Sequence, residues 1–152
     1  MAIGEICCRD LVFVSREDTV TLAAQLMRQR HVGSLIVVDD RAGRSIPAGI
    51  ITDRDIVVAV VALGLDPDVI PVGDIMGREL FCVRNDAGIA ETAELMRLKG
   101  VRRLPVIDNA GELVGVVASD ELMSLLADEM SALATMVSRA PRDETETRKR
   151  MS

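Results

Sequence analysis

The sequence predicts a mixed α/β fold of the α+β type, made of two βαββα repeats that follow one another along the chain. First, the chain aligns with itself at a shift of 69 positions, so that residues 4–40 match residues 73–109 without a gap and about a third of the pairs are identical. Second, each half contains short apolar runs typical of buried strands, interleaved with two segments of helical periodicity. At 152 residues, the chain can form one core of ordinary size or two small cores packed together.

The matched segments set the expected boundaries of the repeats. GEICCRDLVFV aligns with GDIMGRELFCV, and AAQLMRQRHVGSLIVVDD aligns with TAELMRLKGVRRLPVIDN. We expect the first repeat to span residues 4–69 and the second to span residues 73–130. Residues 131–152 are expected to form the end of a helix and a charged tail.

The first helix of the first repeat is predicted from the segment TLAAQLMRQR, which follows the short strand LVFV. Thr19 is the expected N-cap, because its hydroxyl can accept a hydrogen bond from a free amide of the first turn. His31 is expected to end the helix in the left-handed conformation, since its repeat partner is Gly100. The inward face of the helix is predicted to carry four residues: Leu22, Ala23, Leu26 and Met27.

A hairpin of buried strands is expected after the first helix of each repeat. In the first repeat, SLIVVDD and AGIIT are joined by a turn around Ala42 and Gly43. In the second repeat, LPVIDNAGELVGVVA has the same design, with its turn at Asn109 to Gly111. The additional residues RSIP lengthen the first hairpin relative to the second.

A second helix follows each hairpin. The helix DRDIVVAVVAL, stopped by Gly64, is apolar nearly all the way round, so it needs cover on several sides. This excess of apolar surface predicts a homodimer in which helices pack against helices. In the second repeat the helix is ELMSLLADEMSALATMV, and the charged residues from Pro141 onward are expected to be disordered.

Composition excludes several classes of function. The net charge is −6, which disfavours a nucleic-acid partner, because phosphate backbones are bound chiefly by clustered Lys and Arg. No apolar run approaches the roughly 20 residues that span a bilayer, so no membrane association is expected. The start of the chain, MAIGEICCRD, lacks the features of a secretory signal, which predicts a cytoplasmic location. The chain has no Trp or Tyr, so a bound base must lie largely against aliphatic side chains.

The duplicated unit, its GEI and GDIM lead-in segments and the sequence GIITDRDI resemble the tandem cystathionine-β-synthase (CBS) domain pair, or Bateman module. The resemblance covers residues 4 to about 127. It implies a pseudo-two-fold pair of repeats with two related clefts, and dimers shaped as flat discs. It also implies a regulatory ligand of the adenosine type, namely AMP, ATP, NAD(H) or S-adenosylmethionine, and no catalytic cofactor.

By this resemblance, Thr52 and Asp55 in the segment TDRD are candidate contacts to the phosphate and ribose of a ligand. A carboxylate can accept hydrogen bonds from both ribose hydroxyls, and a helix N-terminus favours anions. The same pattern is also a helix capping box that needs no ligand, so both interpretations stay open. Arg54 lies between them and is a further candidate for a phosphate contact.

The second repeat departs from this motif, since Ala118 and Glu121 stand where the first repeat has Thr52 and Asp55. Ser119 and Asp120 lie one step along and are candidate substitutes. A one-residue shift turns a side chain by about 100° around a helix, which leaves the competence of this cleft open.

A third group of candidates lies on the first hairpin strand of each repeat. By the same resemblance, Pro105, which lacks a backbone donor, is a candidate for the base pocket, while Arg102 and Arg103 could meet a phosphate. Their alternative role is structural, as a strand proline beside solvated arginines. Ser34 and Ile36 occupy the matching positions of the first repeat and complete the candidate ligand residues.

Three classes of function follow from these residues. The leading one is a non-catalytic regulatory module that binds an adenosine-type nucleotide and acts as a metabolite or energy sensor on a partner that the sequence does not identify. The alternative is a structural or interaction dimer with degenerate ligand sites. An enzyme is the least favoured class, because the sequence offers no nucleophile with its base, metal cluster or glycine-rich phosphate loop. The cysteines Cys7, Cys8 and Cys82 are interpreted as small apolar fillers.

Overall fold

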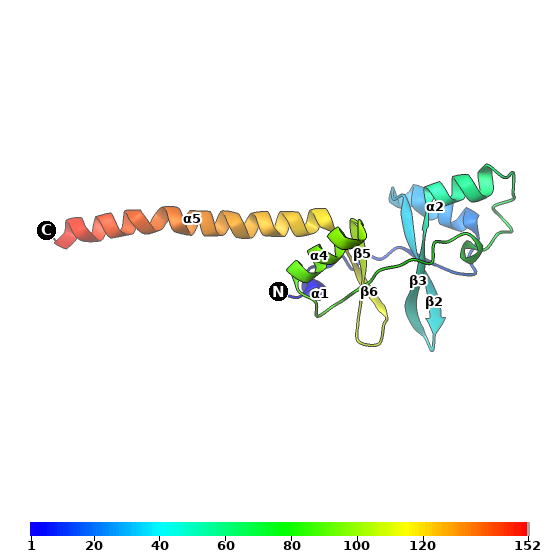
Figure 1. Cartoon of the computed structure of the whole chain (residues 1–152), viewed down its shortest axis with the longest axis horizontal. Helices are drawn as coiled ribbons and strands as arrows, with labels where there is room; N and C mark the ends of the chain where they lie inside the picture. Colours follow the sequence, from blue (N-terminus) through cyan, green and yellow to red (C-terminus); the bar gives the residue numbers. More distant parts are fainter. Residues whose placement is uncertain (152) are drawn as a thin grey trace.

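The computed structural model of this chain describes the backbone of residues 1–151 and the side chains of residues 1–139. It has two three-stranded sheets that lie next to each other, with a long helix extending away from the second (Figure 1). The predicted mixed fold of two homologous repeats is confirmed. The first sheet has the order β1-β2-β3, with β1 (Phe13–Ser15) parallel to β2 (Ser34–Arg41) and β3 (Arg44–Thr52) antiparallel to it.

The second sheet repeats this topology. Its order is β4-β5-β6, with β4 (Val83–Arg84) parallel to β5 (Arg103–Ile107) and β6 (Leu113–Ala118) antiparallel to it. In both hairpins the pairing register shifts at one point of the middle strand, between Val37 and Val38 and between Val106 and Ile107. Both hairpins turn through residues with positive φ, namely Ala42 and Gly43 in the first and Gly111 in the second, as predicted.

Helices follow β1, β3, β4 and β6 as predicted, and two short helices in the lead-in segments were not predicted. The helices are, in chain order, α1 (Ile3–Ile6), α2 (Val20–Arg30), α3 (Asp53–Ile56), η1 (Val57–Val61, a π-helical turn continuing α3), η2 (Val72–Asp74, a 3₁₀ turn), α4 (Ile89–Lys99) and α5 (Ser119–Met151). Helices α2 and α4 end at His31 (φ 54°) and Gly100 (φ 65°), both in the left-handed conformation. The prediction that His31 ends its helix is therefore confirmed.

The predicted N-cap of α2 is confirmed, but its predicted inward face is wrong at one position. The Thr19 hydroxyl accepts a hydrogen bond from the Leu22 amide at 3.2 Å. The buried residues are Val20, Ala23 and Met27, at the spacing of one helix face, whereas the Leu22 side chain is 39% exposed. Leu22 directly precedes Ala23, so it points about 100° away from the centre of the buried face.

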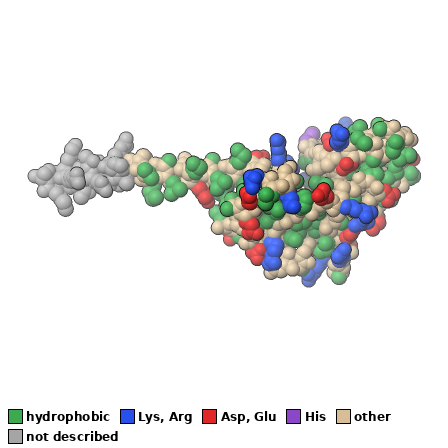
Figure 2. Space-filling model, viewed as in Figure 1, with side chains coloured by type: hydrophobic (Ala, Val, Ile, Leu, Met, Phe, Trp, Pro, Cys, Tyr) green, Lys and Arg blue, Asp and Glu red, His purple; other side chains and the backbone are tan. Residues whose placement is uncertain are grey.

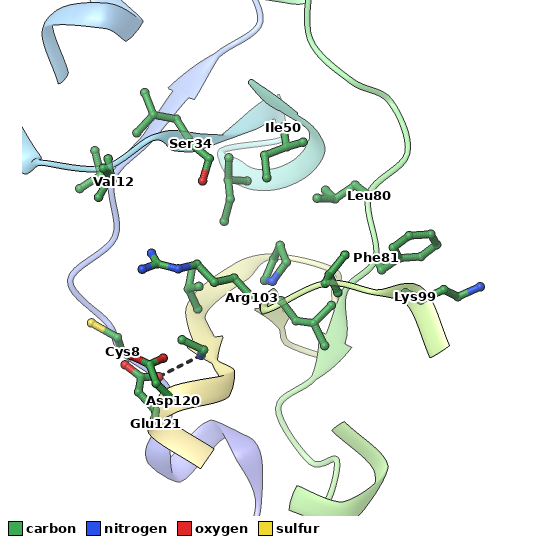
Figure 3. Close-up of a pocket in the computed structure, with 18 of the residues that line it drawn as sticks. Cys8, Val12, Ser34, Ile50, Leu80, Phe81, Lys99, Arg103, Asp120 and Glu121 are labelled. Carbon is green, nitrogen blue, oxygen red and sulfur yellow. Dashed lines mark hydrogen bonds between the residues drawn. The ribbon is translucent and has the colours of Figure 1, made fainter. Parts of the chain in front are cut away.

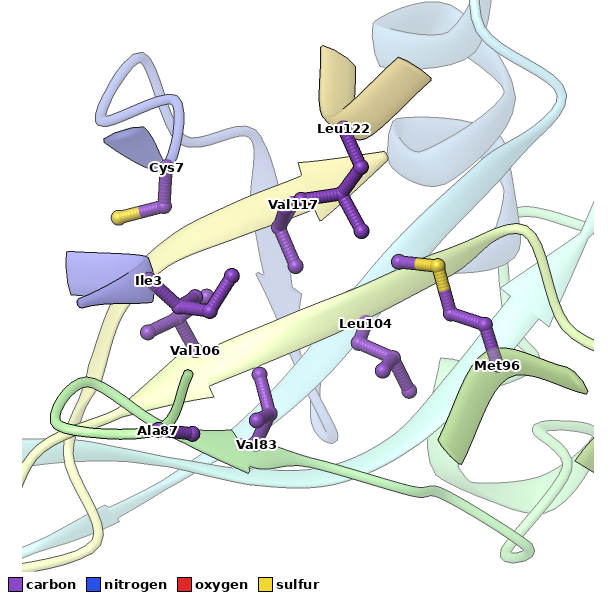
Figure 4. Close-up of a cluster of buried hydrophobic side chains, with 9 residues drawn as sticks. All are labelled: Ile3, Cys7, Val83, Ala87, Met96, Leu104, Val106, Val117 and Leu122. Carbon is purple, nitrogen blue, oxygen red and sulfur yellow. The ribbon is translucent and has the colours of Figure 1, made fainter. Parts of the chain in front are cut away.

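The lead-in segment of each repeat packs into the hydrophobic core of the other repeat. Ile3 and Cys7, at the start of the chain, belong to the buried cluster of the second repeat with Val106 and Leu122 (Figure 4). Conversely, Val72 and Met76 belong to the buried cluster of the first repeat. Backbone hydrogen bonds fix both crossings, for example from the Cys8 amide to the Val116 carbonyl and from the Gly77 amide to the Ile50 carbonyl. Each repeat is therefore completed by the lead-in of the other.

Two equivalent glycines permit these crossings. Gly49 on β3 and Gly115 on β6 occupy matching places in the two hairpins. A Cβ at Gly49 would overlap the carbonyl oxygen of Gly77, and a Cβ at Gly115 would overlap Sγ of Cys7. The repeated glycines thus give the lead-in backbone room to lie directly on each sheet.

The apolar residues that the first repeat does not cover lie mainly on η1 and the turn after it. Val57, Val58, Val61, Leu63 and Leu65 are between 49% and 68% exposed. Figure 2 shows hydrophobic side chains gathered at the end of the molecule that carries these residues. The prediction that this helix lacks sufficient cover within one chain is therefore confirmed.

Helix α5 projects from the second repeat and also exposes apolar residues (Figure 1). Met123, Leu126, Met130, Leu133 and Val137 follow one another at alternating spacings of three and four residues, and each is at least 42% exposed. Helix α5 extends to Met151, and the predicted disorder of the charged tail from Pro141 stays a prediction, because the side chains from residue 140 onward lie outside those that the structure describes. No helix in the described part of the chain is long and apolar enough to cross a membrane.

A candidate ligand cleft between the repeats

A cleft of about 450 Å³ opens between the two sheets. Its walls come from β2 and β3 of the first repeat and from β5, β6 and the start of α5 of the second, together with the loops that follow both lead-ins (Figure 3). The volume is within the usual range for small-molecule sites. Because both repeats contribute walls, a bound molecule would touch both at once.

Aliphatic side chains form most of the cleft wall. Ile36 and Ile50 line it from the first sheet, Pro105 and Val116 line it from the second, and Leu80 comes from the second lead-in loop. Ile36 and Val116 also belong to the small apolar cluster that joins the two sheets. The cleft therefore offers a largely aliphatic surface for a flat ring, as the composition predicts, and Phe81 is the one aromatic side chain of the described residues that lines it.

Polar groups enter the cleft at its edges. The hydroxyl of Ser34 is directed into the space, and the side chain of Arg103 extends across it (Figure 3). Ser34 and Arg103 hold equivalent places, since Ser34 pairs with Thr52 and Arg103 pairs with Ala118 at the ends of the two hairpins. The described cleft thus has one hydroxyl and one guanidinium on opposite walls.

The junction of β6 and α5 forms one end of the cleft. Ala118, Asp120 and Glu121 line it, and the Glu121 carboxylate accepts a hydrogen bond from the Ala118 amide at 3.0 Å. Ser119, one of the candidates, is half-buried, and its amide donates to the carbonyl of Arg102. Asp120 and Glu121 lie in the first turn of α5, where backbone amides have no acceptor within the helix.

The corresponding junction of the first repeat is a complete capping box. The Thr52 hydroxyl accepts from the Asp55 amide at 3.1 Å, and the Asp55 carboxylate accepts from the Thr52 amide at 2.9 Å. Neither residue lines the described cleft, and Arg54 is exposed outside it. The capping interpretation of this motif is therefore realised in the structure, while a ligand role for these residues stays a prediction.

The structure brings half of the ten candidate ligand residues together. Ser34, Ile36, Arg103, Pro105 and Asp120 line the cleft. The other five do not: Thr52, Arg54, Asp55, Arg102 and Ser119.

Sequence reasoning missed Cys8, Asp10, Leu80, Phe81 and Lys99, which also line the cleft. Four of them follow the repeated lead-in motifs. That repetition was the available signal, because it aligns Asp10 with Glu79 and Val12 with Phe81, and all four line the cleft.

The three cysteines differ in their surroundings. Cys7 is buried, as expected of an apolar filler, and burial raises the pKa of the Cys82 thiol. Cys8 is exposed at the end of the cleft, so its interpretation as a filler is wrong. Its position follows from the crossing of the lead-in, since both the amide and the carbonyl of Cys8 bond to Val116. Within the part of the chain that is described, no group of three or more acidic, His or Cys residues is placed to hold a metal ion.

Comparison with known proteins identifies relatives of this chain. It is 35% identical to an uncharacterized protein of Methanopyrus kandleri over 82% of its own length, and it spans 62% of that protein. It is 37% identical to hypoxic response protein 1 of Mycobacterium tuberculosis over 72% of its length, covering 73% of that protein.

Solved structures share the fold. A crystal structure of Hypoxic Response Protein I with two coordinated zinc ions has a TM-score of 0.69 at 33% identity, covering 82% of this chain and 98% of the other. The CBS domain pair of the protein MJ0100, in complex with 5′-methylthioadenosine and S-adenosyl-L-methionine, has a TM-score of 0.66 at 22% identity. That alignment covers 83% of this chain and 99% of the other.

The family model of the CBS domain matches this chain twice, over residues 3–62 and 72–128. These two matches fall on the two repeats and leave the projecting part of α5 outside. Together with the shared fold, they establish that this chain belongs to the CBS domain family as a tandem pair.

Proposed function

We propose that this chain is a non-catalytic regulatory module that binds an adenosine-type ligand in the cleft between its repeats. The observation that carries the proposal is the cleft itself, whose aliphatic walls come from both sheets and whose polar groups stand at its edges. Such a combination of apolar surface and a few placed polar groups is typical of small-molecule sites.

The ligand would act by linking the two repeats. Ile36 and Ile50 on one wall and Pro105 on the other belong to different sheets, so a ring between them would favour one relative placement of the repeats. A ligand shifts such an equilibrium only by the difference in its affinity for the two states. We propose that this change in the relative placement of the repeats regulates a partner protein that contacts the exposed helices. We propose the adenosine moiety because the CBS domain pair of MJ0100, which shares this fold, was solved with two adenosine compounds.

The exposed residues of η1 and α5 support a homodimer. Five apolar side chains around η1 and six along α5, Met136 among them, are each at least 42% exposed. Such a concentration is typical of a protein interface. The alternative function, a structural dimer with degenerate ligand sites, is favoured by the complete capping box at Thr52 and Asp55, which uses both groups without a ligand.

A thermal-shift panel tests the ligand proposal and separates it from the structural alternative. The panel contains AMP, ADP, ATP, NAD, NADH, S-adenosylmethionine and 5′-methylthioadenosine. A ligand at 100 times its dissociation constant stabilises the folded state by about 2.7 kcal/mol, which raises the melting temperature by several degrees. At least one adenosine compound is expected to do so. A flat panel at millimolar concentration would favour the structural alternative.

A further inference from the structure

The charged groups of the cleft are predominantly acidic. Six charged residues line it, four of them carboxylates: Asp10, Glu79, Asp120 and Glu121 against Lys99 and Arg103. All six are exposed, so their charges act on a ligand through partly screened interactions. A nucleoside polyphosphate is normally held by several cations or by free backbone amides, because its own charges repel carboxylates.

Only one of the two cations is directed into the cleft. Nζ of Lys99 lies over the ring of Phe81, 4.7 Å from its centroid, and Figure 3 shows this side chain pointing away from the space. Arg103 extends across the space from β5 (Figure 3). Among the described residues, no salt bridge joins Arg103 to a carboxylate of the cleft. One guanidinium can pair with a single carboxylate or phosphate, but not with a chain of three phosphates.

Two of the four carboxylates, those of Asp120 and Glu121, lie together at one end of the cleft. Figure 3 shows Asp120 and Glu121 beside Cys8, with Ile50 and Leu80 across the space from them. A ligand whose adenine ring lies against Ile50 and Leu80 would therefore have the two carboxylates at the opposite end of the cleft. Glu121 is held in this place by the bond from the Ala118 amide.

From this arrangement we infer that the cleft selects adenosyl compounds whose substituent is cationic or uncharged, and disfavours nucleoside polyphosphates. The inference rests on the proposed function and names the ligand class of the same site. An adenosyl sulfonium with an amino-acid tail fits the charges: its sulfonium and ammonium groups match Asp120 and Glu121, and its carboxylate matches Arg103. A triphosphate places like charges at the acidic end.

Calorimetric titration of the full chain tests the inference with three probes in one buffer. S-adenosyl-L-methionine and S-adenosyl-L-homocysteine differ by one methyl group and the sulfonium charge, and ATP provides the polyanion. We expect the sulfonium compound to bind at least about fivefold tighter than its uncharged analogue and at least about tenfold tighter than ATP. The preference over the analogue should shrink between 50 and 500 mM NaCl, because salt screens exposed charges.

Two matched variants test whether the carboxylate of Asp120 causes the preference between these ligands. Asp120→Asn removes one charge at the acidic end and keeps the shape of the side chain. It is expected to reduce the preference for S-adenosyl-L-methionine over ATP by at least about threefold. Asp128→Asn changes an exposed residue of the same helix that does not line the cleft, and it should leave the preference unchanged.

The outcomes separate the two proposals. If none of the adenosyl compounds binds at millimolar concentration, the proposed function and the inference both fail. If ATP binds as tightly as S-adenosyl-L-methionine, the inference is overturned while the proposed function stands. An equal reduction in Asp120→Asn and Asp128→Asn would also overturn it, because the selectivity would then reflect the net charge of the chain.

Discussion

Thr52 and Asp55 cap the backbone of each other at the end of the first hairpin, each side chain accepting a hydrogen bond from the amide of the other residue. The second repeat keeps half of this arrangement, since Glu121 accepts from the Ala118 amide but Ala118 has no hydroxyl. The same backbone junction is thus stabilised by two side-chain hydrogen bonds in one repeat and by one in the other.

Thr52→Ala gives the first repeat the residue found in the second. It is expected to lower the free energy of unfolding by about 1 kcal/mol, the usual effect of losing an N-cap, and to lower the melting temperature by about 2–4 °C. Thermal unfolding followed by circular dichroism measures the change. An unchanged melting temperature would show that this hydrogen bond contributes nothing to stability.

Asp55→Ala distinguishes capping from ligand binding at the same junction. If the carboxylate only caps the helix, the variant unfolds at a lower temperature but binds an adenosine compound like the wild type. If Asp55 contacts ribose, as the resemblance implies, the affinity should fall at least about tenfold through the loss of charge-assisted hydrogen bonds. Titration and melting of one preparation decide between the two roles.

Much of the fold could be predicted because the repeat supplies each local signal twice. The alignment of His31 with Gly100 indicated a helix end at both places, and both residues have positive φ. The exchange of lead-ins could not be predicted, because the pattern around Ile3 and Cys7 does not show which of two similar cores these residues join.

The candidate site was predictable only in part, because the path of the lead-in loops could not be predicted. Ser34 and Arg103 were found because they stand beside a motif, whereas Cys8 and Phe81 reach the cleft through the path of the lead-in loops.

The crossing of the lead-ins predicts an unequal response of two facing glycines. Gly49→Ala places a Cβ against the Gly77 carbonyl oxygen and should destabilise the fold by about 1–3 kcal/mol. Gly77→Ala is the control, because its Cβ would meet Ile50 only at ordinary contact distances, the nearest being 3.6 Å. Chemical denaturation of both variants measures the difference, and equal losses would contradict the close approach.

The ion pair between Arg16 and Asp39 predicts an acid-sensitive part of stability. Arg16 donates two hydrogen bonds to the Asp39 carboxylate, at 2.8 and 2.9 Å, and this contact lowers the pKa of Asp39 below its ordinary value of 3.8. A carboxylate with a lowered pKa stabilises the fold above the pKa it has when unfolded, and that contribution is lost as the pH falls through the lower, folded value.

Asp39→Asn is therefore expected to be less stable than the wild type at pH 6, with the difference shrinking below about pH 4. Urea denaturation between pH 6 and pH 2.5 follows it. The control is Asp40→Asn, whose side chain holds the turn amide of Gly43 and makes no salt bridge among the described residues. A difference that stays constant over this range would contradict the role of the ion pair.

The dimer proposal predicts that a charge on η1 separates the subunits without unfolding them. Val61 is 65% exposed, so Val61→Glu should hardly change the stability of one chain but should prevent its burial against a second. Leu98→Glu is the matched control, an apolar residue of α4 with 64% exposure that stands apart from this surface. Light scattering is expected to give the mass of a dimer for the wild type and for Leu98→Glu, and the mass of a monomer for Val61→Glu. A monomeric wild type would contradict the dimer proposal.

The most direct test of the central claim is a calorimetric titration of the full chain with S-adenosyl-L-methionine and 5′-methylthioadenosine, repeated on Ser34→Trp. The Ser34 hydroxyl is directed into the cleft, so a Trp side chain there fills the space that the ligand needs. Ser131→Trp, on the exposed surface of α5, is the control. The account predicts saturable binding to the wild type and the control, and at least a tenfold weaker affinity for Ser34→Trp. The absence of binding to the wild type at millimolar ligand, or equal binding to Ser34→Trp, would contradict it.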